Sequence, residues 1–327
     1  MSEFRYDPLL NDWVIIAAKR QNRPNIANVE CAFCPGSGKV PEEGYGVMRY
    51  PNDFPSMSVE AQTPASVSGM FVNKPAYGRC EVVLYSDRHD AKLRDMSDEK
   101  MFELVKLWRE IYRQYSEDEK IKYTFIFENR GREVGVTMIH PHGQVYGYGF
   151  MPKRISEVMT NLKAYRGERS GCLICDMLKS EKNEGSRVVF SDEYFTAYVP
   201  YYSRYPYGVM IVSNAHISSL DEMDDDMLVS LGSCVRNTAG MYDNLFDKEF
   251  PYMMCMYNAP VHEVGAKELW HFHIEYYPPL RNADTQKYNA SSETGCNAHC
   301  NPTLPEEKAA ELRDAFIKYT NTAKNEG

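Results

Sequence analysis

The apolar positions of the chain change from a β-rich run to helical spacing twice, in the same order. The first run ends at residue 85, and apolar residues then recur every three or four positions over residues 101–115, which predicts an amphipathic helix. The apolar positions of this predicted helix are Met101, Leu104, Val105, Trp108, Ile111, Tyr112 and Tyr115. Ser97 or Asp98 stands where a capping residue belongs. A second run covers residues 209–212, and a helical pattern with Leu228, Leu231 and Val235 follows it.

An internal repeat accounts for this order. When the chain is aligned on His89 and His216, both segments have Ser three residues before the histidine, Leu four after it, Met seven after it and Asp nine after it. In each half a C-x-x-C pair comes earlier, and a β-rich run with an H-x-H element comes later. These matches predict a duplicated α+β domain, with its boundary in the stretch of residues 153–171.

The cysteines and histidines of the repeat predict two metal sites. Zinc in structural sites prefers four tetrahedral ligands, and a C-x-x-C pair supplies two thiolates from one turn. The first predicted set is Cys31, Cys34, His89 and His140, and the second is Cys172, Cys175, His216 and His271. We expect two Zn²⁺ ions per chain, with iron as the alternative in the second site. A redox role for the cysteine pairs would need a thioredoxin-like βαβ context, which the pattern does not indicate.

Composition and charge exclude several classes of function. The chain has 327 residues, of which 43% are hydrophobic, and its net charge is −9. An acidic chain is a poor general partner for nucleic acid, because that affinity comes mostly from neutralised phosphates. No apolar stretch approaches the ~18 residues of a membrane span, and the N-terminus does not resemble a signal peptide. We expect a cytoplasmic protein with no nucleic-acid or membrane partner, whose nine cysteines are thiols or metal ligands.

The string HPHGQ at residues 140–144 is the candidate reactive element. We expect His140 to face the first metal and His142 to face a pocket, with Pro141 fixing the backbone between them. A histidine with one protonated ring nitrogen can use the other nitrogen as a nucleophile. Gly131 and Gly135 precede the motif and predict a loop whose backbone N–H groups can approach a phosphate.

The chain resembles the galactose-1-phosphate uridylyltransferase family of the histidine-triad superfamily in the strings CAFCPG, FENRG, HPHGQ and WHFHIEYYPPLR. The resemblance covers nearly the whole chain. It implies two tandem histidine-triad-like domains, residues 1–165 and 166–327, each an antiparallel sheet packed with helices. It also implies uridylyl transfer between UDP-glucose and galactose 1-phosphate, in a ping-pong reaction through UMP bound covalently to His142. The expected assembly is a homodimer.

The resemblance also implies roles for further residues. Gln144 stands where hydrolytic relatives carry a third histidine, and Gln can form hydrogen bonds to phosphate but cannot shuttle a proton near neutral pH. The residues that match substrate-binding positions of the family are Arg20, Arg23, Asn52, Phe54, Asn129, Thr137, Lys287 and Glu293. The two arginines are implied to reach phosphates across the dimer interface. Lys287 and Glu293 belong to the segment that is implied to hold hexose and phosphate.

The second half departs from the best-known bacterial members of that family. Those members hold a second metal with one Glu and three His, and they lack the second C-x-x-C pair. Here one of these histidines is missing, in the string MYNAP, so His271 is expected to complete a Cys2His2 set. His273 is the counterpart of His142, but IEYY follows it, and we expect the second half to be non-catalytic while it contributes a substrate-binding loop.

Two other functions stay open at the level of the sequence. HPHGQ indicates phosphorus chemistry and not a particular base, so another sugar-1-phosphate nucleotidyltransferase, similar to ADP-glucose phosphorylase, fits the same elements. The alternative outside the enzymes is a nucleotide-binding protein whose catalysis has lapsed, although the intact motif argues against it. The preferred hexose 1-phosphate and the roles of His273 and His299 also stay open.

Overall fold

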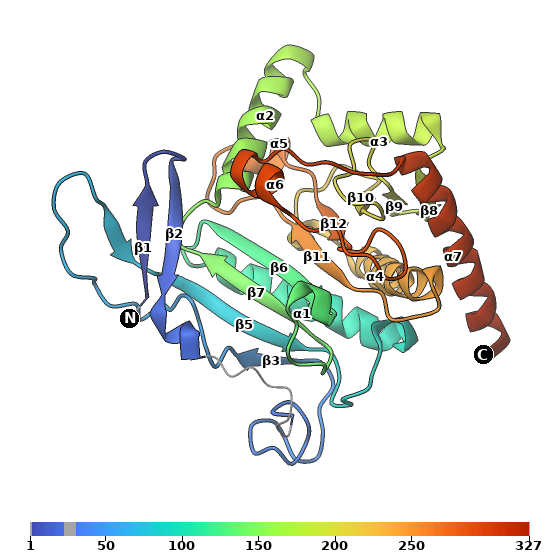
Figure 1. The fold of residues 1–327 in the computed structure, drawn as a ribbon, viewed down its shortest axis with the longest axis horizontal. Coiled ribbons are helices and arrows are strands. Elements are labelled where there is room, and N and C mark those ends of the chain that lie inside the picture. Colours follow the sequence, from blue (N-terminus) through green and yellow to red (C-terminus); the bar gives the residue numbers. More distant parts are fainter. Residues whose placement is uncertain (1, 23–30, 327) are drawn as a thin grey trace.

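A computed structural model describes residues 2–22 and 31–326 (Figure 1). The strands are β1 (Ser2–Asp7), β2 (Asp12–Ala17), β3 (Met48–Pro51), β4 (Asn73–Pro75), β5 (Gly78–Leu84), β6 (Tyr123–Arg130), β7 (His142–Tyr148), β8 (Val188–Ser191), β9 (Phe195–Tyr198), β10 (Val209–Ser213), β11 (Tyr252–Tyr257) and β12 (His273–Tyr277). The α-helices are α1 (Asp98–Ser116), α2 (Lys153–Arg169), α3 (Leu173–Glu184), α4 (Asp225–Leu245), α5 (Ala266–Leu269), α6 (Ser291–Cys296) and α7 (Pro305–Glu326). Each half therefore contains both α-helices and strands, in groups along the chain.

One continuous nine-stranded sheet contains strands from both halves of the chain. Its order is β3-β5-β7-β6-β11-β12-β10-β9-β8, so β6 of the first half pairs directly with β11 of the second. All of its pairings are antiparallel, and at the junction Phe127 lies opposite Cys255. The predicted α+β class with repeated antiparallel sheets is confirmed. The predicted boundary after residue 165 lies inside α2, the helix that connects the halves, and it stays a prediction.

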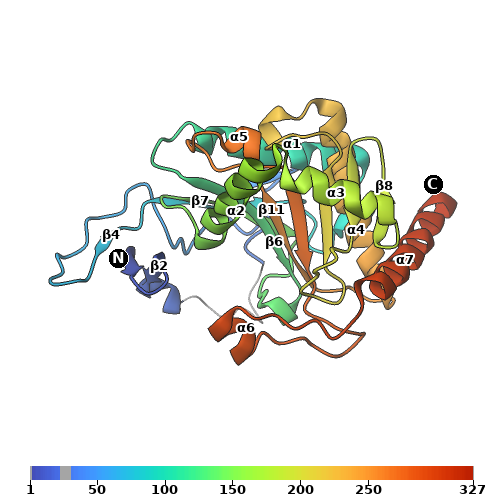
Figure 2. The same cartoon turned by 90° about the horizontal axis from the view of Figure 1, so that it is seen from above.

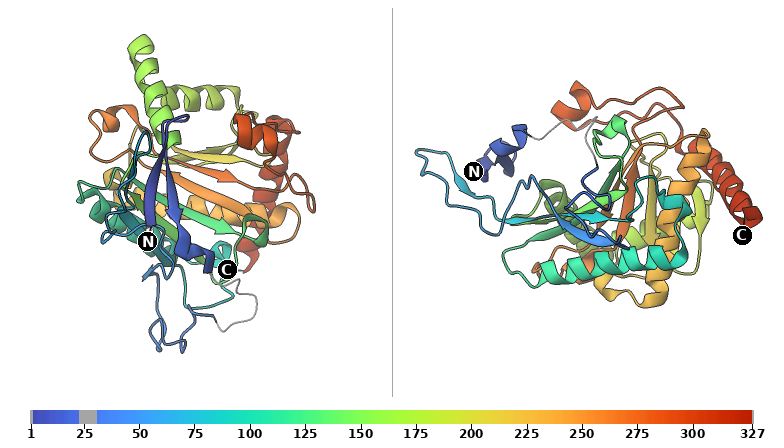
Figure 3. Two further views of the ribbon diagram at one scale, coloured as in Figure 1. Left: turned by 60° about the vertical axis from the view of Figure 1, so that its left-hand side comes forward. Right: turned by 90° about the horizontal axis from the view of Figure 1, so that it is seen from below.

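Helices α1 and α4 cover one face of this sheet, as the apolar pattern predicts (Figure 3). All seven apolar positions predicted for α1 are buried, and the Ser97 side chain caps the helix by accepting a hydrogen bond from the Lys100 N–H. In α4, the predicted positions Leu228, Leu231 and Val235 are buried in the same core. The repeat thus places equivalent helices on one side of a shared sheet.

The other face of the sheet carries α2, α3 and the candidate site. Apolar side chains of α2 pack against Tyr123 and Tyr257, and those of α3 pack against Tyr198 and Met210. The separate sheet β2-β1-β4 and helix α7 lie at opposite ends of the molecule (Figure 2). Within the part of the chain that the structure describes, no helix combines the length and the apolar character needed to cross a membrane.

Candidate active site and metal centres

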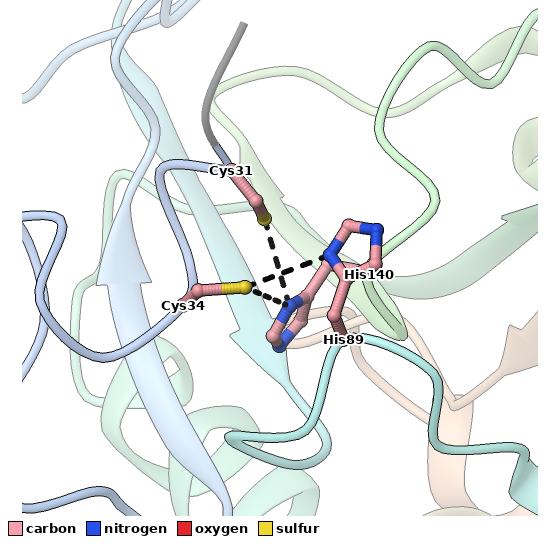
Figure 4. A group of neighbouring side chains, drawn as sticks. All are labelled: Cys31, Cys34, His89 and His140. Carbon is pink, nitrogen blue, oxygen red and sulfur yellow. Dashed lines mark hydrogen bonds between the residues drawn. The ribbon is translucent and has the colours of Figure 1, made fainter.

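The four predicted ligands of the first metal converge beside the start of β7 (Figure 4). Their candidate ligand atoms all lie within 4.8 Å of one another. The Cys31 Sγ lies 3.6 Å from the His140 Nδ1, and the Cys34 Sγ lies 3.6 Å from the His89 Nδ1. Tetrahedral zinc, with bonds of about 2.3 Å to sulfur and about 2.0 Å to nitrogen, places such atoms about 3.6 Å apart. The residues present therefore fit a zinc ion.

Hydrogen bonds behind His140 orient its ring for metal binding. The His140 Nε2 lies 2.6 Å from the Ser86 carbonyl oxygen and 3.0 Å from the Tyr45 hydroxyl. A carbonyl oxygen only accepts, so Nε2 carries the proton and Nδ1 faces the cysteines. Burial lowers the pKa of His140, although the Ser86 bond acts in the opposite direction. Burial thus favours the neutral ring, and the bond to Ser86 places its proton on Nε2, so Nδ1 is available to a metal.

The second set of ligands repeats this arrangement. The Cys175 Sγ lies 3.6 Å from the His216 Nδ1 and 3.3 Å from the His271 Nδ1, and all four ligand atoms lie within 4.8 Å of one another. The His271 Nε2 lies 2.9 Å from the Ser213 carbonyl oxygen, as the His140 ring does from its own carbonyl partner. The Cys172 side chain accepts a hydrogen bond from the Cys175 N–H at the first turn of α3. Both clusters can hold a metal ion.

His140 and His142 serve different sites although they are two residues apart. Side chains two apart in a regular strand share a face, but β7 begins only at His142, after Pro141. The break at Pro141 lets His140 turn into the metal centre while His142 stays on the strand. The His142 Nδ1 lies 2.7 Å from the His140 carbonyl oxygen, so Nδ1 carries the proton of the neutral ring. The lone pair is then on Nε2, which is the nitrogen that a nucleophilic histidine needs.

Gln144 follows His142 on the same face of β7. The Tyr146 hydroxyl donates to the Gln144 Oε1 at 3.0 Å, which orients the amide. Its NH₂ group can donate to phosphate oxygens, and the residue adds no charge. The pair His142 and Gln144 thus offers a nucleophile and a neutral hydrogen-bonding group side by side.

A cavity of about 530 Å³ opens beside His142. Asn129, at the end of β6, lines it together with the loop that the glycines predict. This loop contains a short 3-10 helix, residues 132–134, between Gly131 at φ +98° and Gly135 at φ +82°. Such φ values favour glycine and turn the backbone at both ends of the loop. Cations and carboxylates both line the cavity, which suits a ligand with phosphate and hydroxyl groups.

Other residues predicted for the nucleotide lie around this cavity but do not all reach it. The Asn52 Oδ1 accepts a hydrogen bond from the Phe54 N–H at 2.9 Å in the turn after β3, and neither residue lines the cavity. Thr137 is half-buried between Val136 and Met138, which both line it. These positions match the expected ones in sequence, and their contacts with substrate stay predictions.

Three of the predicted substrate residues lie away from His142 within this chain, and a fourth is not described. Arg20 lies in the 3-10 helix Ala18–Asn22 and does not line the cavity. Glu293 lines a second cavity, of about 670 Å³, and its carboxylate pairs with the Lys287 Nζ at 3.3 Å. Arg23 lies outside the described residues. One chain alone therefore does not gather all of the expected substrate contacts at its nucleophile.

The structure extends the repeat beyond the H-x-H elements. The His273 Nδ1 lies 2.8 Å from the His271 carbonyl oxygen. This repeats the contact of the His142 Nδ1 with the His140 carbonyl oxygen in the first half. The Tyr277 hydroxyl donates to Glu275, the counterpart of Gln144. Alignment of HPHGQVY with HFHIEYY carries this signal, because both strings end in the tyrosine that donates to the residue two positions before it.

A partly exposed ion pair lies beside His273, the second-half counterpart of the nucleophile. The Arg154 guanidinium donates to both Glu275 oxygens at 3.0 Å, and the His273 Nε2 lies 3.6 Å from the same carboxylate. Burial alone would raise the pKa of Glu275, but the nearby His273 ring and the charge of Arg154 outweigh it and lower that pKa to about 2. The second site therefore holds a fixed negative charge where the first holds a neutral amide.

Both halves of the chain match a known family. The galactose-1-phosphate uridyl transferase N-terminal domain matches residues 1–152, and the C-terminal domain of the same family matches residues 158–320. The galactose-1-phosphate uridylyltransferase of Thermotoga maritima is 39% identical over 97% of this chain and 100% of its own length.

Solved structures agree with these matches. A structure of a uridylyltransferase is similar with a TM-score of 0.89 at 27% identity, and the match covers 97% of this chain and 99% of that chain. An ADP-glucose phosphorylase from Arabidopsis thaliana with bound ADP-glucose shares the fold, with a TM-score of 0.72 at 22% identity over 96% of this chain and 99% of that chain. From the two matched domains and the relative at 39% identity, the chain belongs to the galactose-1-phosphate uridylyltransferase family.

Proposed function

We propose that this protein transfers a uridylyl group between UDP-glucose and galactose 1-phosphate, with His142 as the nucleophile. The observation that carries the proposal is the hydrogen bond of 2.7 Å from the His142 Nδ1 to the His140 carbonyl, which leaves the lone pair on Nε2. Family membership supplies the substrates. The cavity beside His142, lined by Asn129 and the Gly131–Gly135 loop, accommodates the phosphates.

The reaction proceeds in two halves. The His142 Nε2 attacks the α-phosphorus of UDP-glucose, a nitrogen–phosphorus bond forms, and the bond to the glucose 1-phosphate oxygen breaks. The ring becomes cationic while Nδ1–H continues to donate to the His140 carbonyl, which stabilises the developing charge. Galactose 1-phosphate then attacks the same phosphorus, and the electron pair returns to Nε2. UDP-galactose and glucose 1-phosphate are the products.

Gln144 serves the transfer without exchanging protons. Its amide, oriented by Tyr146, donates to a phosphate oxygen as negative charge builds up around the phosphorus. A departing sugar phosphate is a weak base and needs no proton from a neighbouring acid. A neutral amide therefore suits a transferase, and Thr137 adds a hydroxyl near the departing phosphate.

Zinc is the proposed metal in both clusters, and its role is structural. Two thiolates and two imidazoles favour zinc among the available divalent metals. Four protein ligands fill a tetrahedral shell, so the first zinc holds His140 in place and leaves the phosphorus chemistry to His142. The two sets of ligands, at Cys31 and at Cys172, give two zinc ions per chain.

A homodimer completes the proposal. Apolar side chains are exposed on and beside the sheet β2-β1-β4, and exposed apolar patches mark interfaces. These side chains are Leu9, Leu10, Val14, Met70, Phe71 and Val72. A second copy on this end of the molecule would account for Arg20, which does not line the cavity of its own chain. The cytoplasm suits such a protein, because metal-binding thiolates require reduced cysteines.

The test is covalent labelling with UDP-glucose that carries the radiolabel on the α-phosphate. We expect label on His142, its release by galactose 1-phosphate as UDP-galactose, and no label from UDP-glucose labelled only on the β-phosphate. ADP-glucose and ATP labelled on the α-phosphate test the other nucleotidyltransferases. Stronger labelling by ADP-glucose would indicate nucleotidyl transfer from ADP-glucose instead. Binding of the nucleotide sugars without any label would indicate a nucleotide-binding protein without catalysis.

A further inference from the structure

Two consecutive residues after β5, Tyr85 and Ser86, form hydrogen bonds with the HPHGQ motif through their backbone groups. The Tyr85 N–H donates to the Pro141 carbonyl at 3.1 Å, and the Ser86 carbonyl binds the His140 Nε2 at 2.6 Å. Tyr85 is 1% exposed, and its ring packs edge-on against Trp108 of α1. The backbone of the motif is thus tied to a residue whose side chain lies in the core.

The Tyr85 side chain fills the space beneath Gly143. A Cβ atom placed on Gly143 would lie 2.2 Å from the Tyr85 hydroxyl oxygen and 3.1 Å from the Phe127 carbonyl oxygen. Gly143 follows His142 on β7, so this contact lies on the opposite face of the strand from the nucleophile. The Tyr85 phenol therefore determines how closely β7, the strand that carries His142, can approach the core.

Glu128 adds a carboxyl to the same place. It follows Phe127, which pairs with Gln144, so Glu128 lies beside Gly143 on the core side of the sheet. The Tyr252 hydroxyl donates to the Glu128 Oε1 at 3.0 Å. The Glu128 Oε2 and the Tyr85 hydroxyl both lie on the core side of the sheet at Gly143, and among the described residues neither of these buried atoms has a hydrogen-bond partner. Glu128 is 6% exposed, and burial raises its pKa although the charge of Arg130 acts in the opposite direction. A buried carboxyl thus lies with two tyrosine hydroxyls beneath the strand that carries the nucleophile.

The second half of the chain provides an internal comparison for this arrangement. Glu275 corresponds to Gln144 and pairs with Cys255, so Ile274 corresponds to Gly143 and Met256 to Glu128. Ile274 and Met256 are fully buried and apolar. The same position in the same sheet is therefore filled without any polar group in the half that we expect to be non-catalytic.

We propose that Glu128 is a positioning residue for the nucleophile: through the Tyr85 phenol beneath Gly143, it fixes where His142 stands. This inference rests on the proposed function, because it needs a nucleophile at His142. Burial of a carboxyl opposes folding unless it is well paired, and the repeat shows that the sheet packs with Met in its place. Glu128 and Tyr85 also line the cavity beside His142, so the carboxyl is retained for this site and not for packing. Displacement of a nucleophile by about 1 Å can cost on the order of a hundredfold in rate.

The experiment compares variants by the single-turnover rate of His142 uridylylation, by KM for UDP-glucose, by metal content and by thermal unfolding. Glu128→Met copies the second half, Glu128→Gln keeps the hydrogen-bonding shape, and Tyr85→Phe removes only the phenol oxygen. We expect Glu128→Met to slow uridylylation about 30-fold, with KM within about threefold and both metal ions retained. Tyr85→Phe should slow it about tenfold, and Glu128→Gln should keep at least about a third of the rate.

Tyr115→Phe is the matched control. Tyr115 is a buried tyrosine that packs beneath Gly147 of the same strand, 2.9 Å from where a Cβ would be, and the carboxyl that acts on its phenol is Glu81. Its variant should react within about twofold of the wild-type rate. An equal loss in this control would overturn the proposal, because any buried phenol under β7 would then have the same effect.

Other outcomes would also decide the question. Normal uridylylation by Glu128→Met or by Tyr85→Phe, with wild-type labelling intact, would overturn the positioning role alone. A rate loss that follows loss of metal or a large fall in melting temperature would show a merely structural residue. Absence of the His142 adduct in the wild-type protein would overturn the proposed function, and the positioning role with it.

Discussion

At the scale of single residues, the charge next to the histidine separates the two halves. Gln144 and Glu275 occupy equivalent places, and each accepts a hydrogen bond from the tyrosine two residues further on. A carboxylate that holds its negative charge repels a phosphate, whereas an amide donates to it. The ion pair of Glu275 with Arg154 explains why the second histidine should not react, even though its Nδ1 is held in the same way.

The first prediction concerns a negative charge beside His142, introduced by copying Glu275 of the second half at position 144. Gln144→Glu should lower kcat/KM for UDP-glucose by at least about 100-fold, which corresponds to about 2.7 kcal/mol of lost transition-state stabilisation. Gln144→Ala removes the amide without adding charge and should lose about tenfold less. Steady-state kinetics of the three proteins measure the difference. Equal losses in the two variants would mean that the negative charge has no effect.

The second prediction concerns His142 itself. His142→Ala should abolish transfer while metal content and melting temperature stay unchanged, because this residue belongs to neither metal cluster. His142→Gly should still bind UDP-glucose but form no covalent adduct. Exchange of labelled glucose 1-phosphate into UDP-glucose measures the nucleophile directly. Exchange at the wild-type rate in either variant would contradict the assignment.

At the scale of elements, the first metal cluster fixes the entry into β7. Cys31 and Cys34 come from one turn, and His140 stands just before the strand that carries the nucleophile. The second cluster instead joins the start of α3 to His271, which stands just before β12, and no reaction is expected at His273 on that strand. The two clusters are chemically alike, but loss of the first metal should therefore slow the reaction more than loss of the second.

The third prediction uses this difference. Cys31→Ser should lose one zinc equivalent and lower both the melting temperature and the uridylylation rate, the latter by about 100-fold if the nucleophile shifts by about 1 Å. Cys172→Ser should also lose one equivalent and lower the melting temperature, but its rate should stay within about tenfold of wild type. Metal analysis, thermal melting and labelling on the same preparations give all three values. One zinc per chain in the wild-type protein, unaffected by Cys172→Ser, would contradict the two-site proposal.

Local patterns in the sequence predicted individual elements well. Features that depend on which distant segments pair with each other could not be predicted. The seven apolar positions of α1 are all buried, because helical spacing along one segment decides which face is apolar. The metal ligands could be grouped because the repeat supplies the same residue types twice. The pairing of β6 with β11 could not be predicted, since two distant strands leave no periodic signal of their partnership. For the same reason, the sequence did not show that Glu293 would lie in a cavity separate from that of His142.

At the scale of the whole molecule, the two halves of the chain share one sheet and one core. The pairing of β6 with β11 buries the backbone groups of both strands, and α1 packs against α4 across the same boundary. Ion pairs such as Arg113 with Asp221 and Arg236 with Asp98 also join the halves. Separation of the halves would expose a long strand edge and the apolar sides of two helices, which is a template for aggregation.

The last prediction follows from this shared core. If the chain is divided between residues 152 and 153, where β7 has ended and α2 begins, each half expressed alone should aggregate or lack a cooperative unfolding transition. Expressed together, the halves should copurify as a complex that binds two metal ions and is labelled at His142. The uncut chain is the control for expression and labelling. An isolated first half that stays monomeric, unfolds cooperatively and forms the adduct would show that each half folds by itself, because the edge of β6 would then be stable without β11.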